Sequence, residues 1–341
     1  MTSEGIAVQT DDSAAPSGRR GRRAADVPAL VERARAGEAR SVARLISLVE
    51  DASPALREVA AALAPHTGNA QVIGLTGSPG VGKSTTTTAL VKALRAEGKR
   101  VGVLAVDPSS PFSGGALLGD RVRMQDHAGD DGVYIRSMAS RGHLGGLAWA
   151  TPQALRVLDA AGCDVVLIET VGVGQSELEI ASLADTTLVL LAPGMGDGIQ
   201  AAKAGILEVA DVFVVNKADR DGADQTVRDL RYMQSLGNRD AGAGHWRAPI
   251  CRTVASRETD NGIDTVLEKI EAHRQWLESS GEGHRRRCER AAREIEAIAL
   301  ASLRERMGDV HGSAALGSLA ESVVAGETDP YRAADELLAR L

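Results

Sequence analysis

Two short segments of the chain carry residue types that bind nucleotides, and the first would hold the phosphates. Residues 77–84 read Gly-Ser-Pro-Gly-Val-Gly-Lys-Ser, which matches the Gly-x-x-x-x-Gly-Lys-Ser/Thr pattern of a P-loop. The glycines let backbone N–H groups converge on phosphate oxygens, and the following helix points its positive N-terminus at the same anion. In this pattern the lysine bridges the β- and γ-phosphates and the Ser/Thr hydroxyl ligates Mg²⁺. We therefore expect nucleotide contacts from Gly77, Ser78, Pro79, Gly80, Val81, Gly82, Lys83, Ser84 and Thr85.

The second segment, Asn216-Lys217-Ala218-Asp219, carries an amide and a carboxylate suited to a guanine base. It follows an apolar run, and ligands in open α/β sheets bind where such strands end. A carboxylate at Asp219 can accept from guanine N1–H and the 2-amino group, a donor pair that adenine lacks. Asn216 and Lys217 belong to the same loop, and a backbone N–H at Ala255 could complete the pocket. Together, the two segments predict a site for GTP and GDP.

Three acidic residues stand where a nucleotide-bound Mg²⁺ would need them. Asp107 ends an apolar run, Asp120 lies in the glycine-rich segment that follows, and Glu169 closes a later apolar run. A carboxylate can hold Mg²⁺ directly or through water. Taken without the P-loop, each could equally be an acidic residue at a turn or a strand end. We expect Ser84 and these carboxylates to surround the metal, and Glu169 to position the attacking water.

The residues just after Glu169 bear on the rate of hydrolysis. Gly172 occupies the place where GTPases generally carry a glycine whose N–H touches the γ-phosphate. The next residue, Val173, can neither orient water nor donate a hydrogen bond from its side chain, and Gln175 and Glu177 are polar alternatives nearby. The sequence therefore predicts slow intrinsic hydrolysis that accelerates when a partner reshapes the site.

A further segment, residues 193–203, contains glycines that would permit motion. Gln200 and Lys203 share a helix face at i, i+3. They are candidate catalytic residues of a switch, although spacing alone would equally suit two solvated helix residues.

Composition bounds the class of protein. A chain of 341 residues is long enough for one large α/β domain with smaller helical additions. Hydrophobic residues make up 43% of the chain but aromatic residues only 2%, so the core must consist of Val, Leu, Ile and Ala. Few aromatics and a net charge of −7 argue against nucleic acid as a partner.

Cysteine usage and hydropathy favour a cytoplasmic protein. Cys163, Cys251 and Cys288 are isolated, and the first two lie in or beside apolar runs as ordinary core residues would. No apolar stretch reaches the length needed to span a membrane. The basic segment 19–23 is not followed by the apolar run of an export signal.

Apolar runs alternate with helical segments through the middle of the chain, which predicts a mostly parallel sheet covered on both faces. The expected strands lie near 72–76, 101–106, 164–168, 187–192, 212–215 and 249–254. The expected fold is α/β: a P-loop NTPase with a mostly parallel sheet flanked by helices, plus N- and C-terminal helical extensions. We divide the chain into a disordered tail at 1–25, a helical segment at 26–70, a P-loop GTPase domain at 71–280 and a C-terminal helical arm at 281–341.

The expected arm carries an apolar stripe among many charges. Within residues 284–307, an apolar residue recurs at helical spacing, at Ile295, Ile298, Ala299 and Leu303. A stripe on a charged peripheral helix needs a partner, either its own domain or a second subunit, and we favour a dimer contact. Asp329-Pro330 predicts the start of a last helix, whose apolar side would be formed by Tyr331, Ala334, Leu337 and Leu341.

At its motifs the chain resembles the MeaB/ArgK-like family, the GTPases associated with methylmalonyl-CoA mutase. The matching segments are 77–84, 106–110, 114–124, 169–177, 193–203 and 216–219. They cover nearly the whole expected GTPase domain, whereas residues 1–70 and 281–341 match mainly in layout.

The resemblance implies a homodimeric P-loop GTPase that acts as a chaperone for an adenosylcobalamin-dependent mutase. Such a chaperone gates cofactor loading and protects or reactivates the mutase. By the same resemblance, Lys83 and Ser84 bind phosphate and Mg²⁺, Asp107, Asp120 and Glu169 surround the metal and the attacking water, and Gln200 and Lys203 belong to a switch that the partner reorganises.

Three alternatives stay open at this point. A metallochaperone GTPase would need a Cys/His cluster or a His-rich tail, and the chain has seven scattered histidines and no paired cysteines. An ATP-dependent kinase linked to amino-acid transport is disfavoured by Asp219. A nucleotide-binding scaffold that does not hydrolyse would be excluded by measurable phosphate release.

Overall fold

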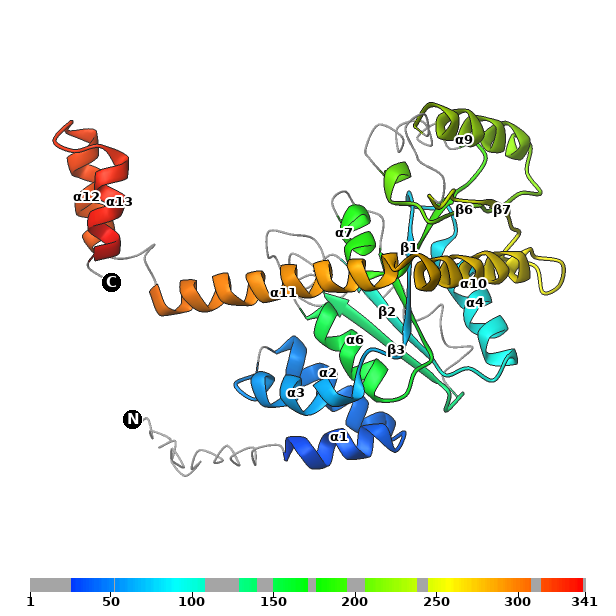
Figure 1. Cartoon of the computed structure of the whole chain (residues 1–341), viewed down its shortest axis with the longest axis horizontal. Coiled ribbons are helices and arrows are strands. Elements are labelled where there is room, and N and C mark those ends of the chain that lie inside the picture. Colours follow the sequence, from blue (N-terminus) through cyan, green and yellow to red (C-terminus); the bar gives the residue numbers. More distant parts are fainter. Residues whose placement is uncertain are drawn as a thin grey trace, which may run out of the picture.

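The structure is a computed structural model, and it shows a sheet domain from which one long helix extends to a helical hairpin (Figure 1). It describes residues 26–51, 53–107, 129–139, 150–170, 176–194, 206–237, 245–307 and 314–339. The tail expected at residues 1–25 falls outside these ranges, as do four of the predicted site residues, Asp120, Gly172, Gln200 and Lys203.

The described strands form one seven-stranded sheet in the order β3-β2-β4-β1-β5-β6-β7, and each neighbouring pair is parallel. This arrangement confirms the predicted P-loop NTPase fold, with β1 at the centre of the sheet. The strands are β1 (Gln71–Thr76), β2 (Val101–Asp107), β3 (Val133–Ala139), β4 (Val165–Thr170), β5 (Thr186–Leu191), β6 (Val212–Val215) and β7 (Ile250–Arg252).

Helices cover both faces of the sheet, and each face has its own core. On one face, α1 (Val27–Arg35), α2 (Ala39–Glu50), α3 (Leu56–Leu63), α6 (Thr151–Ala160) and α7 (Ser176–Leu183) pack against strand residues such as Val72 and Ile168. On the other face, α4 (Lys83–Ala96) and α10 (Ile263–Ser280) pack against the alternate strand residues, among them Ile73 and Leu167. The alternation follows from the two-residue period of a strand.

A third, smaller core lies near the β7 edge, where α9 (Ala223–Gly237) packs on β5 and β6. Two short 3-10 helices lie after α3, at Ala64–His66, and before β6, at Ile206–Val209. Cys163 and Cys251 are buried in the cores, as predicted. Burial raises the pKa of the Cys163 thiol to about 12 and that of Cys251 to about 11, so both thiols stay protonated at neutral pH.

The sequence analysis missed one strand. β3 pairs with β2 at the edge of the sheet, but Arg136 and Ser137 interrupt its apolar character. An edge strand with one half-buried face does not need a continuous apolar run. Arg136 attaches β3 to α2, because its guanidinium pairs with Glu50 and donates to the Ser47 hydroxyl at 3.2 Å.

The C-terminal helices leave the domain. α11 (Glu282–Met307) runs away from the sheet and leads to the hairpin of α12 (Ala314–Val324) and α13 (Pro330–Ala339) (Figure 1). Asp329 caps α13 as predicted, accepting from the N–H groups of Tyr331 and Arg332. The predicted apolar side of α13 is wrong in part, because Tyr331 and Ala334 are exposed and Ala333 is the buried residue. None of the helices in the described ranges combines the length and apolarity needed to cross a bilayer.

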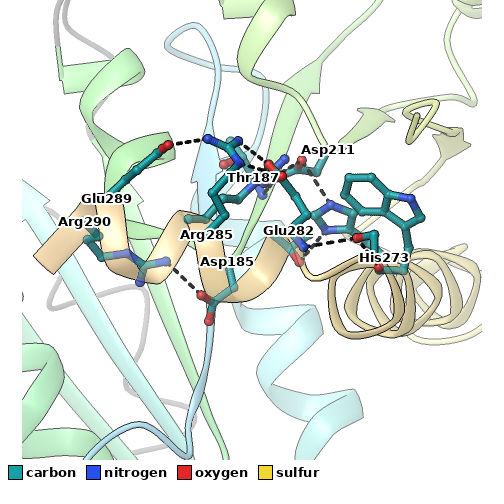
Figure 2. Close-up of polar contacts among 12 residues, drawn as sticks. Asp185, Thr187, Asp211, His273, Glu282, Arg285, Glu289 and Arg290 are labelled. Atoms are coloured by element: carbon teal, nitrogen blue, oxygen red, sulfur yellow. Dashed lines mark hydrogen bonds and ion pairs between the residues drawn. The ribbon is translucent and has the colours of Figure 1, made fainter. Parts of the chain in front are cut away.

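Two aspartates at the amino ends of strands attach α11 to the sheet (Figure 2). The Asp185 carboxylate accepts from the Val72 N–H at 2.9 Å and from the Arg290 guanidinium at 2.8 Å. One strand further along, Asp211 accepts from the Thr187 N–H at 2.8 Å and pairs with Arg286 at 3.2 Å. Because Arg286 and Arg290 are four residues apart, they lie on one face of α11.

Asp211 also lies against an aromatic cluster formed by His273 and Trp276 of α10 and by Trp246. His273 is fully buried, its Nδ1 lies 2.9 Å from the Thr186 hydroxyl, and its Nε2 lies 3.2 Å from Asp211 Oδ1 without hydrogen-bond geometry. The ring stacks on Trp276 and lies close to Trp246. The start of α11 is thereby joined to both the sheet and α10.

We predict that the double variant Arg286→Ala/Arg290→Ala lowers the free energy of unfolding by about 1–3 kcal/mol, because two mostly buried carboxylates each lose a charged partner. Urea denaturation measures the change. Arg285→Ala is the matched control, since Arg285 is 57% exposed and, among the described residues, forms its ion pairs along α11, with Glu282 and Glu289. The control should leave unfolding unchanged, and equal losses in both variants would contradict the anchoring role.

Candidate functional site

The P-loop connects the central strand to α4, and its glycines adopt conformations that other residues avoid. Gly77, Gly80 and Gly82 have φ angles of +139°, +81° and +101°, in the region where a Cβ is strained. A Cβ on Gly77 would lie 2.3 Å from the Leu190 carbonyl oxygen, and one on Gly82 would lie 2.4 Å from Asn216 Nδ2. The loop is therefore held close to β5 and to the segment after β6.

Lys83, the first residue of α4, folds back over the loop. Its ammonium group donates to the carbonyl oxygens of Gly77 at 2.6 Å and Ser78 at 3.2 Å. The side chain is buried, so the charge is held inside the curve of the loop rather than in solvent. A buried cation beside the N-terminus of a helix is the arrangement that binds phosphate.

Glu169 joins β4 to the start of α4. This buried carboxylate accepts from the Ser84 hydroxyl at 2.5 Å and from the Thr87 hydroxyl at 2.9 Å. The register of the sheet places it there, because Glu169 pairs with Leu75 of β1, two residues before the P-loop. Sequence analysis predicted Ser84 and Glu169 but missed Thr87. Its spacing of three residues from Ser84, and hence a shared helix face, was the available signal.

The oxygen atoms around Glu169 fit the metal that the motif implies. A serine hydroxyl beside a buried carboxylate is the hard oxygen donor set that Mg²⁺ prefers. Asp107 ends β2 next to β4, where Val106 pairs with Thr170, so its backbone reaches the same edge of the sheet; its side chain lies outside the described residues. In the described parts of the chain, no three His, Cys, Asp or Glu side chains gather as a metal site.

Asn216 links the P-loop to two further loops. Its amide nitrogen donates to the Val81 carbonyl oxygen at 2.9 Å, and its amide oxygen accepts from the Thr253 hydroxyl and the Ala255 N–H, both at 3.1 Å. The residue is buried. A single side chain thus fixes the distance between the phosphate loop and the segments after β6 and β7.

The remaining residues of the Asn216–Asp219 segment surround this link. Lys217 has a positive φ of 55° and donates from its ammonium group to the Gly80 carbonyl oxygen at 2.6 Å. Asp219 is exposed at the surface of the same turn. The Ala255 N–H already donates to Asn216, so a contact from it to a base would have to share that proton.

The structure therefore brings together the predicted residues from the P-loop, the end of β4 and the loops after β6 and β7. The contacts join Lys83, Ser84, Glu169, Asn216, Lys217 and Ala255. Predicted roles for Asp120, Gly172, Gln200 and Lys203 concern residues outside the described ranges. A parallel sheet with a glycine-rich loop, a buried lysine and a base-side Asn-Lys-x-Asp loop defines a P-loop GTPase.

Comparison with known proteins identifies the family. The family model described as methylmalonyl Co-A mutase-associated GTPase MeaB matches residues 42–311. The chain belongs to this family, as its motifs predicted.

Individual relatives agree with this assignment. A Pyrococcus abyssi protein, whose name assigns it to the GTPases, is 48% identical over 91% of this chain and 95% of its own length. The GTPase ArgK of Escherichia coli is 44% identical over 74% of this chain and 77% of its own length. A crystal structure described as the LAO/AO transport system kinase superposes with a TM-score of 0.68 at 27% identity, covering 92% of this chain and 96% of that one.

We predict that Gly82→Ala weakens GTP binding by roughly tenfold or more, because the new methyl group would displace Asn216 and open the link between the loops. Isothermal titration of GTP measures the effect. Gly98→Ala is the matched control, since Gly98 also has a positive φ, +80°, but faces open space. It should cost some stability and leave GTP affinity unchanged. Equal affinities of the two variants for GTP would show that Asn216 does not set the geometry of the loop.

Proposed function

We propose that this chain is a GTP-hydrolysing chaperone that gates cofactor loading into an adenosylcobalamin-dependent acyl-CoA mutase, and that protects or reactivates that mutase. The observation that carries the proposal is the match of residues 42–311 to the mutase-associated GTPase family. The geometry around Lys83, Glu169 and Asn216 supports the GTPase half of the proposal, because it joins a phosphate-binding loop to a base-side loop.

The proposed roles follow from the positions of the residues. Lys83 binds the β- and γ-phosphates, and the buried end of its side chain leaves little solvent to screen that charge. Ser84 and Glu169, with Asp107 and Asp120, would hold Mg²⁺, which neutralises developing charge on the phosphate oxygens when bound. Thr87 orients the Glu169 carboxylate through its hydroxyl. Asp219, whose side chain is exposed, would accept from the guanine base.

The proposed assembly is a homodimer that uses α11. Four apolar side chains on this helix are exposed, namely Ile295, Ile298, Leu300 and Leu303. Two of them are 67% and 53% exposed, Ile295 and Leu303, so the described part of the chain does not cover the stripe. Burial of such a stripe against a second copy would remove apolar surface from water.

An ATP-dependent kinase linked to transport is the second candidate function, because the structure with a TM-score of 0.68 is described as the LAO/AO transport system kinase. Both functions use a P-loop, so the phosphate side of the site does not distinguish them. The base side does, since a kinase that uses ATP has no need of a carboxylate facing the base. Competition at equal concentrations decides: ATP that displaces labelled GTP would favour the kinase.

We predict that Lys83→Ala abolishes GTP hydrolysis and removes the nucleotide dependence of mutase binding, because the γ-phosphate loses its main cationic contact. Phosphate release and co-purification with the mutase, with and without a non-hydrolysable GTP analogue, measure the two effects. Lys92→Ala, on the exposed side of α4, is the control and should hydrolyse normally. A wild-type protein that never co-purifies with the mutase would refute the chaperone role while leaving the GTPase intact.

Asp219→Asn should weaken GTP and shift preference toward xanthine nucleotide, because the amide can donate to the xanthine 2-oxo group but cannot accept two guanine protons. A loss of roughly tenfold or more in GTP affinity corresponds to one charged hydrogen-bonding group. Titrations of GTP, XTP and ATP on wild type and variant measure it. Unchanged guanine selectivity would remove Asp219 from the base pocket.

A further inference from the structure

The start of α4 contains a run of hydroxyl side chains that the Gly-x-x-x-x-Gly-Lys-Ser pattern does not require. Threonine occupies every position from 85 to 88, directly after Ser84. Threonine is a poor helix former, because its branched Cβ loses rotamer freedom against the preceding turn. Such a run at the start of a helix indicates that the hydroxyl groups have a use of their own.

The threonines at 86–88 share one local arrangement. Each hydroxyl lies within hydrogen-bond distance of the carbonyl oxygen four residues earlier, and this contact favours one rotamer. The distances are 2.9 Å from Thr86 to Gly82, 3.1 Å from Thr87 to Lys83 and 3.0 Å from Thr88 to Ser84. Because successive residues are rotated by about 100° around a helix, the three side chains point in three different directions.

The Thr87 side chain is the one that points toward β4. Its hydroxyl lies 2.9 Å from Oε2 of Glu169 and has a single proton for two nearby acceptors. The Lys83 carbonyl oxygen already faces the Thr87 N–H within the helix, whereas the carboxylate is charged and closer, so the proton goes to Glu169. Thr87 is fully buried and Glu169 is 4% exposed, so bulk water does not compete for this oxygen.

The other oxygen of the same carboxylate has a different neighbour. Glu169 Oε1 accepts from the Ser84 hydroxyl at 2.5 Å, and the hydroxyl at this place in a P-loop is the one that ligates Mg²⁺. Oε1 therefore lies on the metal side of the carboxylate, and Oε2 is held on the side of α4. Turning both oxygens toward Ser84 would break the charged hydrogen bond to Thr87, which is costly in a buried site.

Mg²⁺ and Ca²⁺ differ in what they require of a carboxylate. Mg²⁺ demands a nearly octahedral arrangement and keeps several waters, so it uses few protein oxygens. Ca²⁺ takes roughly six to eight oxygen ligands in flexible geometry, and a carboxylate often binds it through both oxygens. A glutamate that can offer one oxygen suits Mg²⁺ and not Ca²⁺.

We propose that Thr87 is a positioning residue that makes the site selective for Mg²⁺ over Ca²⁺, because it holds Glu169 with one oxygen on the metal side. The inference rests on the Mg²⁺ site of the proposed function. It goes beyond that function by assigning the choice of ion to a residue outside the P-loop pattern. Thr87 acts through Glu169, to which its hydroxyl donates.

Isothermal titration of Mg²⁺ and of Ca²⁺ into the full chain, loaded with a non-hydrolysable GTP analogue, tests the inference. Thr87→Val removes the hydroxyl at nearly constant volume and frees Oε2 to turn toward the metal. Mg²⁺ affinity should fall about tenfold or more, and Ca²⁺ affinity should hold or rise. The ratio of the two affinities therefore falls by at least the same factor.

Thr86→Val is the matched control. Thr86 is as fully buried as Thr87 and has the same kind of carbonyl contact, but its hydroxyl bonds to Gly82 and not to Glu169. The control should keep the wild-type ratio of affinities. Thr87→Ser, which keeps the hydroxyl and loses the methyl group, should also keep it, whereas Thr87→Ala should show the same low ratio as Thr87→Val.

Thermal unfolding of the metal-free protein gives a second readout. Thr87→Val should lower the melting temperature more than Thr86→Val, because a buried carboxylate oxygen loses its donor. Equal losses in the two variants would contradict the hydrogen bond on which the inference depends.

The titrations separate failure of this inference from failure of the proposed function. If wild type binds Mg²⁺ and Thr87→Val shows the same affinity ratio as Thr86→Val, the role of Thr87 is overturned and the proposed function is untouched. A low ratio in Thr87→Ser also overturns it, since the hydroxyl would then not be the cause. If the loaded wild type binds no Mg²⁺, the proposed metal site fails, and the inference fails with it.

Discussion

The hydrogen bonds of one buried amide, Asn216, hold the candidate site together. The P-loop, the segment after β6 and the segment after β7 come from three distant parts of the sequence. Each follows the carboxyl end of a parallel strand, so all three lie at the same end of the sheet. Parallel strands bring these ends close together but leave the loops free to vary. Asn216 removes that freedom, because its donor and its acceptor both reach partners on other loops. The distance between the phosphate-binding loop and the base-side loops is then fixed by the Asn216 side chain.

The amino ends of the strands, opposite the candidate site, contact a different part of the chain. There, Asp185 and Asp211 close the amino ends of neighbouring strands and pair with arginines on α11. Each carboxylate accepts a strand N–H and also binds a cation, so the orientation of the arm depends on the sheet rather than on a flexible linker. The candidate nucleotide site and α11 therefore lie at opposite ends of the strands of one sheet.

The helices between these edges connect them. α4 begins with the lysine of the P-loop, and α10 begins after the segment bonded to Asn216 and ends where α11 starts. Rigid packed helices transmit small displacements along their length. These two helices therefore link the candidate nucleotide site to the end of the sheet that carries α11.

The sequence by itself determined the class of fold, the phosphate loop and the base-side loop. Apolar runs that alternate with helices leave few arrangements other than a parallel sheet, and the spacing within each loop is local, so neither depends on distant contacts. Only the tertiary structure decided that Thr87 orients Glu169, that Asn216 serves the P-loop, and that β3 completes the sheet in spite of its polar residues. It also decided which side of α13 is packed, since Ala333 is buried and Tyr331 is exposed. These features depend on side chains from separate elements meeting in space, and a residue's spacing along its own element does not say which neighbour it will meet.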